Sequence, residues 1–178
     1  MATKMVEKMT ASPRQREVCS EGGVMIVIDQ QFLDEITEEA KGSPRLRKNR
    51  NLHHGDEAPC HRLLNAMEPG SYIMPHRHLS EFKDESLVIV RGALGVISFD
   101  EAGNVVDAVR LEAGGNGVAV NIPHGSFHTV VSFASGSVFF ESKGGPYTPI
   151  AAAEKAPWAP EEGSPDAPLF HQRLLECF

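Results

Sequence analysis

Two stretches of this 178-residue chain carry histidine and glutamate at the spacing of a metal site. His76 and His78 are separated by one residue, and Glu85 opens the next run of strand-forming residues. In an extended strand, residues i and i+2 point to the same side, so two such imidazoles converge and a carboxylate on the adjacent strand can meet them. His128 follows a turn that contains proline and glycine. We therefore predict one metal ion bound by His76, His78, Glu85 and His128.

Nitrogen and oxygen ligands of this kind suit a divalent transition metal, namely Fe, Mn, Ni, Co or Zn, and spacing alone does not choose among them. The segment between His78 and Glu85 also holds Glu81 and Asp84, which remain alternatives for the carboxylate ligand. A single histidine is more often packed or solvated than bound to metal. We accordingly expect the others to be supporting or surface groups (His53, His54, His61) or to have no role (His124, His171).

The composition of the chain argues against a nucleic-acid-binding protein, a membrane protein and a disulfide-rich protein. Acidic residues outnumber basic ones, 24 to 17, and the formal charge of −7 argues against a nucleic-acid partner. No apolar run approaches the roughly 20 residues of a membrane span. The three cysteines are too far apart for a disulfide framework or a thiolate zinc site. We expect a cytoplasmic protein without a membrane partner.

The pattern of elements predicts an all-β domain. Residues 1–24 show no apolar periodicity and are predicted to be a flexible tail, and residues 25–178 to form a single domain. In the latter, residues 25–60 should hold a short strand, a helix over 30–42 with Asp29 as N-cap, and an irregular basic loop from 43. Residues 61–142 contain eight short strand-like runs, one of them at 71–75, and a hairpin turn at 100–104. Residues 143–178 should wrap around the barrel and end in a short helix near 170–176.

The two metal-binding stretches resemble the paired motifs of the cupin superfamily. In these motifs HxH and Glu precede a glycine, here Gly92, and PxG precedes the last histidine. The resemblance implies a double-stranded β-helix, or jelly-roll barrel. From residue 25 to about 163 the chain is also similar to the WbuC family of cupin-fold metalloproteins, through SPRLRKNRNLH, RLLNAMEPGSYIMPHRH, ESLVIVRGALGVISFD, IPHGSFHTVV, GSVFFESKGGPY and APWAPEEG. That resemblance implies a bound metal and an association with surface polysaccharide metabolism.

Basic residues precede the barrel of this acidic chain, and arginine suits bidentate contacts with carboxylate or phosphate. A solvated loop with no ligand is the alternative interpretation of these basic residues. If the loop folds over the barrel mouth, we expect a small anionic ligand there. Asn65 and Lys143 lie on or just after strands and face either the solvent or the pocket. The predicted ligand-binding residues are Arg45, Arg47, Arg50, His53, Asn65 and Lys143.

Two classes of function fit this pattern. The first is a metal-dependent enzyme that acts on a sugar acid or sugar phosphate as an isomerase, epimerase or lyase, or else an Fe(II) dioxygenase. The second is a module that binds or senses a small anion without turning it over, since a fold does not fix a function. The sequence names no catalytic residue. A homodimer is expected, because an open edge strand is a liability.

Overall fold

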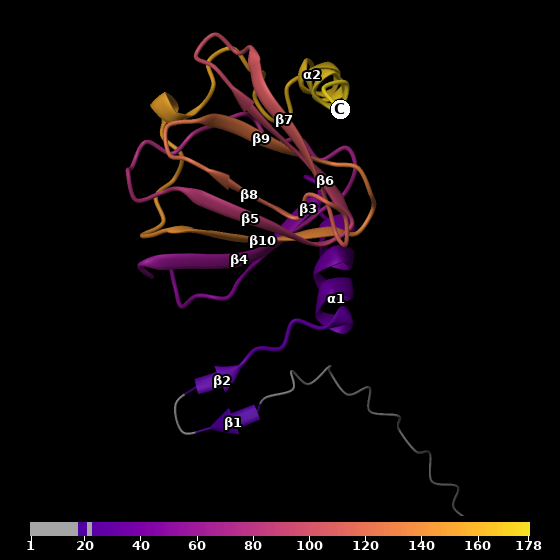
Figure 1. Cartoon of the computed structure of the whole chain (residues 1–178), viewed down its shortest axis with the longest axis vertical. Helices are drawn as coiled ribbons and strands as arrows, with labels where there is room; N and C mark the ends of the chain where they lie inside the picture. The colour runs from indigo at the N-terminus through magenta and orange to yellow at the C-terminus, as the bar shows by residue number, and fades with distance from the viewer. Residues whose placement is uncertain (1–17, 21–22) are drawn as a thin grey trace, which may run out of the picture.

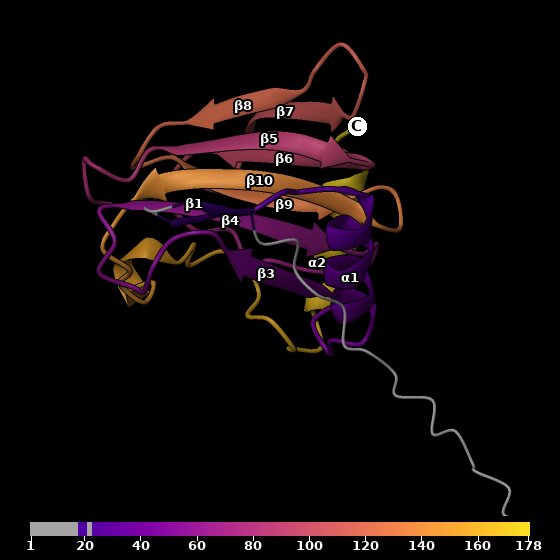
Figure 2. The same ribbon diagram turned by 90° about the horizontal axis from the view of Figure 1, so that it is seen from below.

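The structure, a computed structural model, describes residues 18–20 and 23–178. Most of the predicted tail, residues 1–24, therefore lies outside the described residues. Two sheets stack face to face as a jelly-roll barrel, with a helix against the outer face of each (Figures 1 and 2). The strands of the barrel are β3 (Arg47–Asn51), β4 (Cys60–Met67), β5 (Glu85–Arg91), β6 (Ala93–Phe99), β7 (Val105–Glu112), β8 (Ala119–Ile122), β9 (Phe127–Ser132) and β10 (Ser137–Gly144).

All pairings between barrel strands are antiparallel. One sheet has the order β3-β4-β10-β5-β8 and the other the order β7-β6-β9. The inward side chains of both sheets form an apolar core, to which Leu87, Leu94 and Phe139 contribute. The tight connection between β5 and β6 depends on Gly92, whose φ is 79°, because a Cβ there would collide with Ser137. The predicted turn at 100–104 is formed in the same way, with Gly103 at a φ of 88°.

The predicted N-terminal helix is α1 (Gln30–Lys41). Asp29 caps it, since its Oδ1 accepts a hydrogen bond of 3.0 Å from the Phe32 N–H. Its apolar face, with Ile36 at the centre, covers the outer side of β4 and β10. Arg91 at the end of β5 ties the helix to the sheet by hydrogen bonds to Leu33 O and Asp34.

The C-terminal segment wraps around the other sheet. It contains a short 3₁₀ helix, η1 (Ala152–Glu154), and ends in α2 (Ala167–Leu175), close to the predicted helix. Leu174 and Trp158 from this segment pack with Ile97 and Val131 on the outer face of β6 and β9. None of the helices in the described part of the chain has the length and apolar character that a membrane span requires.

Two expectations about local structure are wrong. The run at 71–75 forms no strand, and only His76 makes isolated bridges, to His128 and Lys155. Pro75 offers no N–H to a ladder, Ile73 O accepts a hydrogen bond from the Thr129 hydroxyl, and Pro75 O accepts one from the Ala156 N–H of the C-terminal segment. The basic segment is also not irregular throughout, because residues 47–51 form β3 along the edge of β4.

The remaining strands form a hairpin of their own. β1 (Val18–Ser20) pairs with β2 (Gly23–Met25), and this hairpin lies apart from the barrel (Figure 1). In the described residues neither strand belongs to a barrel sheet.

We predict that a chain that begins at Met25 has a melting temperature within a few degrees of that of the full chain. The reason is that loss of residues 1–24 leaves every barrel pairing intact. Differential scanning calorimetry of the two chains would measure this. A large drop in melting temperature would mean that the residues before Met25 stabilise the barrel.

Candidate metal site and adjoining cavity

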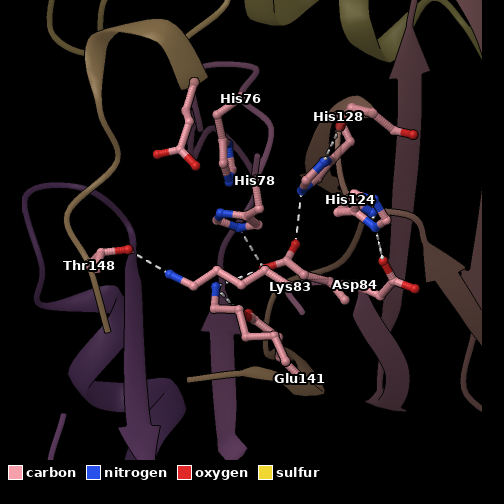
Figure 3. A network of polar contacts seen from close by, with 12 residues as sticks. His76, His78, Lys83, Asp84, His124, His128, Glu141 and Thr148 are labelled. Carbon is pink, nitrogen blue, oxygen red and sulfur yellow. Dashed lines mark hydrogen bonds and ion pairs between the residues drawn. The ribbon is translucent and has the colours of Figure 1, made fainter. Parts of the chain in front are cut away.

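Three imidazoles meet at the polar end of the barrel interior. Their candidate ligand atoms, one each from His76, His78 and His128, all lie within 4.8 Å of one another. His76 and His78 come from the segment before β5, and His128 comes from β9. Figure 3 shows the three rings turned toward a common region. Backbone hydrogen bonds between His76 and His128 hold their two segments together.

Glu85 lies directly against this group. Its Oε1 is 3.0 Å from Nε2 of His78, and its Oε2 is 2.9 Å from Nε2 of His128. Glu85 is the first residue of β5 and is buried. One carboxylate thus spans two imidazoles, and the four side chains that the sequence analysis grouped are neighbours in space.

The two alternative carboxylates lie elsewhere. Asp84 accepts hydrogen bonds from the backbone N–H of His124 and pairs with its ring, separately from the three imidazoles (Figure 3). Glu81 is exposed to solvent. The residues between His78 and Glu85 therefore form a surface loop, and Glu85 is the first residue of the strand that follows.

Backbone carbonyls orient two of the rings. Nδ1 of His76 lies 3.1 Å from Met74 O, and Nδ1 of His128 lies 2.9 Å from Ser126 O. A carbonyl can only accept, so each Nδ1 carries a proton and donates it. In a neutral ring, Nε2 then presents a lone pair, which is the form of histidine that binds a metal.

Burial and charge determine the protonation of these groups. Burial, followed by the neighbouring His128, lowers the pKa of His76 to about 3. Burial alone would raise the pKa of Glu85, but the contacts with His128 and His78 and the charge of Lys143 outweigh it and hold this pKa well below its usual value. Near neutral pH the site therefore presents a neutral His76 and an ionised Glu85.

A second buried carboxylate lies one strand away. Lys143 on β10 places its Nζ 2.7 Å from both Glu85 and Glu141, and Asn65 donates a hydrogen bond of 2.7 Å to Glu141. Burial, together with the charge of Glu85, raises the pKa of Glu141 above its usual value, despite the opposing effect of Lys143. For Lys143 burial acts downward, but the two carboxylates prevail and raise its pKa.

These groups line a cavity of about 330 Å³. Arg45, Arg47, Asn65 and Lys143, which the sequence analysis had selected, all line it. Arg47 donates from Nη1 to Tyr72 O and from Nη2 to both oxygens of Glu162, at 2.6 and 2.7 Å. Arg45 makes no ion pair within the described residues.

Two of the selected residues do not face this cavity. Arg50 pairs with Glu39 and Glu35 and lies over the ring of Phe32, because alternate residues of β3 point outward to α1. His53 stacks on His61, with ring centroids 4.1 Å apart, beside a different hollow. Neither Arg50 nor His53 lines the cavity next to the imidazoles.

Glu141 was missed by the sequence analysis. The signal was present in the alternation of β10, where Phe139, Glu141 and Lys143 are spaced by two and so share one face. β10 pairs with a strand on each side, and Phe139 on it is apolar. The face that holds Phe139 and Glu141 is therefore expected to lie inside the barrel. Among the other histidines, His54 is exposed, and His171 packs edge-on against Tyr72.

The sheet order, the glycine turn before β6 and the converging imidazoles are those of one architecture. The chain has the cupin fold. A family model described as a domain of unknown function (DUF6016) matches residues 28–111, and a comparison with curated proteins gives no match.

Solved structures that resemble the chain include KdgF from a Halomonas species, 21% identical, which covers 60% of this chain and 84% of that chain with a TM-score of 0.46. A cupin-2 domain protein from Shewanella frigidimarina is 17% identical and covers 55% of this chain and 80% of its own, with a TM-score of 0.42. Oxalate oxidase in complex with glycolate is 15% identical, with coverages of 62% and 57% and a TM-score of 0.49.

We predict that Lys143→Met lowers the free energy of unfolding of chelator-treated protein by about 3–5 kcal/mol, because it leaves two buried carboxylates without their shared cation. Adding Glu141→Gln should restore part of this loss, since the second carboxylate is then uncharged. Urea denaturation at pH 7 measures both effects. Lys83→Met is the control, since Lys83 bonds only to Thr148 among the described residues. Additive losses in the double variant would contradict the coupling.

Proposed function

We propose that this cupin binds one divalent transition metal through His76, His78, His128 and Glu85, and acts there on a small anionic, sugar-like substrate. The observation that carries the proposal is the position of Glu85, whose two oxygens face Nε2 of His78 and Nε2 of His128. The metal would be Fe, Mn, Ni, Co or Zn.

The donor set fits a cation. Nδ1 of His128 already carries a proton for Ser126 O, so a neutral His128 has a lone pair at Nε2. A lone pair 2.9 Å from a carboxylate oxygen is repulsive unless a positive charge lies between them. A proton or a metal ion can supply this charge. Because His78 repeats the contact on the other oxygen, one metal ion could take the place of two protons.

A bound metal would act as a Lewis acid that polarises an oxygen of the substrate. The chain's own residues prepare the site for it. Lys143 fixes one oxygen of Glu85 and one of Glu141, so that both carboxylates keep their orientation. Asn65 holds the other oxygen of Glu141.

Charge in the cavity favours an anion. Arg45, Arg47 and Lys143 line it, against the two carboxylates Glu85 and Glu141, and a bound metal would add further positive charge. A substrate carboxylate would make the same kind of charge-assisted contact as Glu162, whose two oxygens accept from Nη2 of Arg47. Arg45 is available for a ligand, since no ion pair within the described residues engages it.

Glu141 supports an enzyme over a binding module. It lines the cavity, and its raised pKa suits a group that exchanges a proton with a substrate. Isomerisation, epimerisation or lysis of a sugar acid or sugar phosphate needs such a group beside the Lewis acid. The similarity to the WbuC family, with its link to surface polysaccharide, belongs to this proposal, as does a cytoplasmic location. A non-catalytic anion sensor and an Fe(II) dioxygenase are the alternatives, and neither would require Glu141.

We predict that His128→Ala loses most of its bound metal while the barrel still folds, because the apolar core does not involve this residue. Elemental analysis of protein purified without a nickel column measures the metal, and circular dichroism verifies the fold. His124→Ala, which alters a surface pair, should keep its metal. Unchanged metal content in His128→Ala would remove this residue from the site.

We predict that Arg45→Ala weakens binding of glucuronate by about 10- to 100-fold, the loss of one charge-assisted contact worth about 1.5–3 kcal/mol, without loss of metal. Isothermal titration calorimetry measures the affinity. Arg50→Ala is the matched control, because Arg50 faces α1, and should leave the affinity unchanged. Equal effects of the two variants would contradict the role of Arg45.

We also propose a homodimer, and expect light scattering of the full chain at micromolar concentration to give twice the mass of 19.4 kDa. β3 and β8 are the edges of the larger sheet and offer unpaired backbone groups for such contact. A monomeric mass across the concentration range would overturn this expectation.

A further inference from the structure

A second hollow adjoins the metal cavity on the concave face of the larger sheet. Its volume is about 300 Å³, and it shares Asn49 and Lys143 with the cavity next to the imidazoles. We call it the side cavity. It extends from these shared residues over β3 and β4 to Tyr147. A ligand held at the imidazoles can therefore reach it by passing Lys143.

The strand register explains why the side cavity is polar. Asn49 and Asn51 on β3 are opposite Asn65 and Leu63 on β4, and residues spaced by two point to the same face. Both asparagines are exposed at the sheet edge but lie on the same face as Asn65, whereas Lys48 and Arg50 point to the acidic residues of α1. This face of β3 thus offers amides rather than apolar side chains.

The chemistry of the side cavity differs from that of the metal cavity. Arg45 and Arg47 line only the metal cavity, whereas the side cavity has one cation, Lys143, which two carboxylates already neutralise. Its other lining groups are mostly uncharged donors and acceptors. This composition suits hydroxyl groups rather than a second anion.

Several of these groups are fixed in place without being fully used. Asn49 donates a hydrogen bond of 3.1 Å to Asn51, which leaves Asn49 Oδ1 and Asn51 Nδ2 free of side-chain partners among the described residues. Nδ1 of His53 lies 3.1 Å from the Arg62 backbone nitrogen and 3.0 Å from the Arg62 carbonyl oxygen, which fixes the ring in place. The buried Nε2 of this ring has no hydrogen-bond partner in the described structure.

Tyr147 supplies an aromatic surface at the rim. Its side chain is 55% exposed, yet its backbone N–H donates a hydrogen bond of 2.7 Å to Asp56 O, which positions the residue. Nε2 of His61 approaches the same carbonyl at 3.0 Å. An exposed but anchored ring beside unused amides is an arrangement that can hold the apolar face and the hydroxyl groups of a sugar together.

We propose that the side cavity is a second binding compartment, which holds a neutral, hydroxyl-rich ring linked to the anionic unit at the imidazoles. The substrate would then be an acidic sugar joined to a second, uncharged sugar. This rests on the proposed function for the anionic unit. Each hollow is at the lower end of the roughly 300–1,000 Å³ of small-molecule sites, so each accommodates one ring rather than an oligomer.

A second metal site is the competing interpretation of this hollow, because it contains His53, His61 and Asp56. The two rings stack at an angle of 20°. Within the described residues, the one group of three or more candidate ligands that converges is His76, His78 and His128. The side cavity therefore lacks the convergence that an ion needs.

Isothermal titration calorimetry with two probes tests the proposal on the full-length protein. The probes are glucuronate and cellobiouronate, in which glucuronic acid is linked to glucose. We expect cellobiouronate to bind at least about tenfold more tightly than glucuronate, which corresponds to about 1.4 kcal/mol. Equal affinities for the two probes would overturn the second compartment while leaving the proposed function intact. Absence of binding by both probes would overturn both proposals.

Variants assign the gain in affinity to the side cavity. Asn51→Ala and Tyr147→Ala should each reduce the affinity for cellobiouronate toward that for glucuronate, and leave the affinity for glucuronate unchanged. Phe82→Ala is the control, since Phe82 is exposed and lines neither hollow. If both variants weaken the two probes equally, or neither changes the preference for cellobiouronate, the side cavity does not hold the second ring.

Discussion

The buried carboxylate of Glu85 is the constraint on which the site depends. An ionised carboxylate in a protein interior is costly unless positive charge and hydrogen bonds compensate it. Here Lys143 on β10 supplies positive charge, and a proton or metal ion shared with Nε2 of His78 and of His128 would complete the compensation. Since β5 and β9 belong to different sheets, Glu85 also joins the two halves of the barrel at its polar end.

This arrangement divides the barrel interior into two parts. Aliphatic and aromatic side chains fill one part and provide the stability that any jelly roll needs. Polar residues line the other part, and each buried carboxylate there has a partner from a neighbouring strand. Such a polar network is tolerated because its members satisfy one another, and it leaves a cavity with a defined set of charges.

β3 and the C-terminal segment determine how much positive charge the cavity has. β3 has an inner face that contributes Arg47 and Asn49 to the cavity, and an outer face that contributes Lys48 and Arg50 to ion pairs with α1. The C-terminal segment neutralises part of the charge at the mouth through Glu162 and Arg47. One short strand therefore serves both the docking of the helix and the recognition of a ligand.

The sequence by itself determined the class of fold, the helix at 30–41 and most of the strands. These features depend on local periodicity, caps and turns, which neighbouring residues specify directly. The set of His76, His78, Glu85 and His128 was predicted from spacing, but His76 and His78 lie on a segment that forms no strand, and the bridge between His76 and His128 brings the two histidine segments together. Tertiary structure was needed to choose Glu85 over Glu81 and Asp84 as the candidate carboxylate ligand, since all three lie close together where a loop meets a strand. Only the pairing of β5 with β10 buries Glu85 inside the barrel.

Long-range pairing decided the rest. Residues 47–51 have the composition of a polar loop, and they form a strand because the edge of β4 offers unpaired backbone groups. The same pairing turns Arg47 inward and Arg50 outward, a distinction that the residue types do not carry. Glu141 and the side cavity likewise depend on which strands are neighbours, β10 beside β4 and β5, and that order is a property of the folded barrel rather than of any segment.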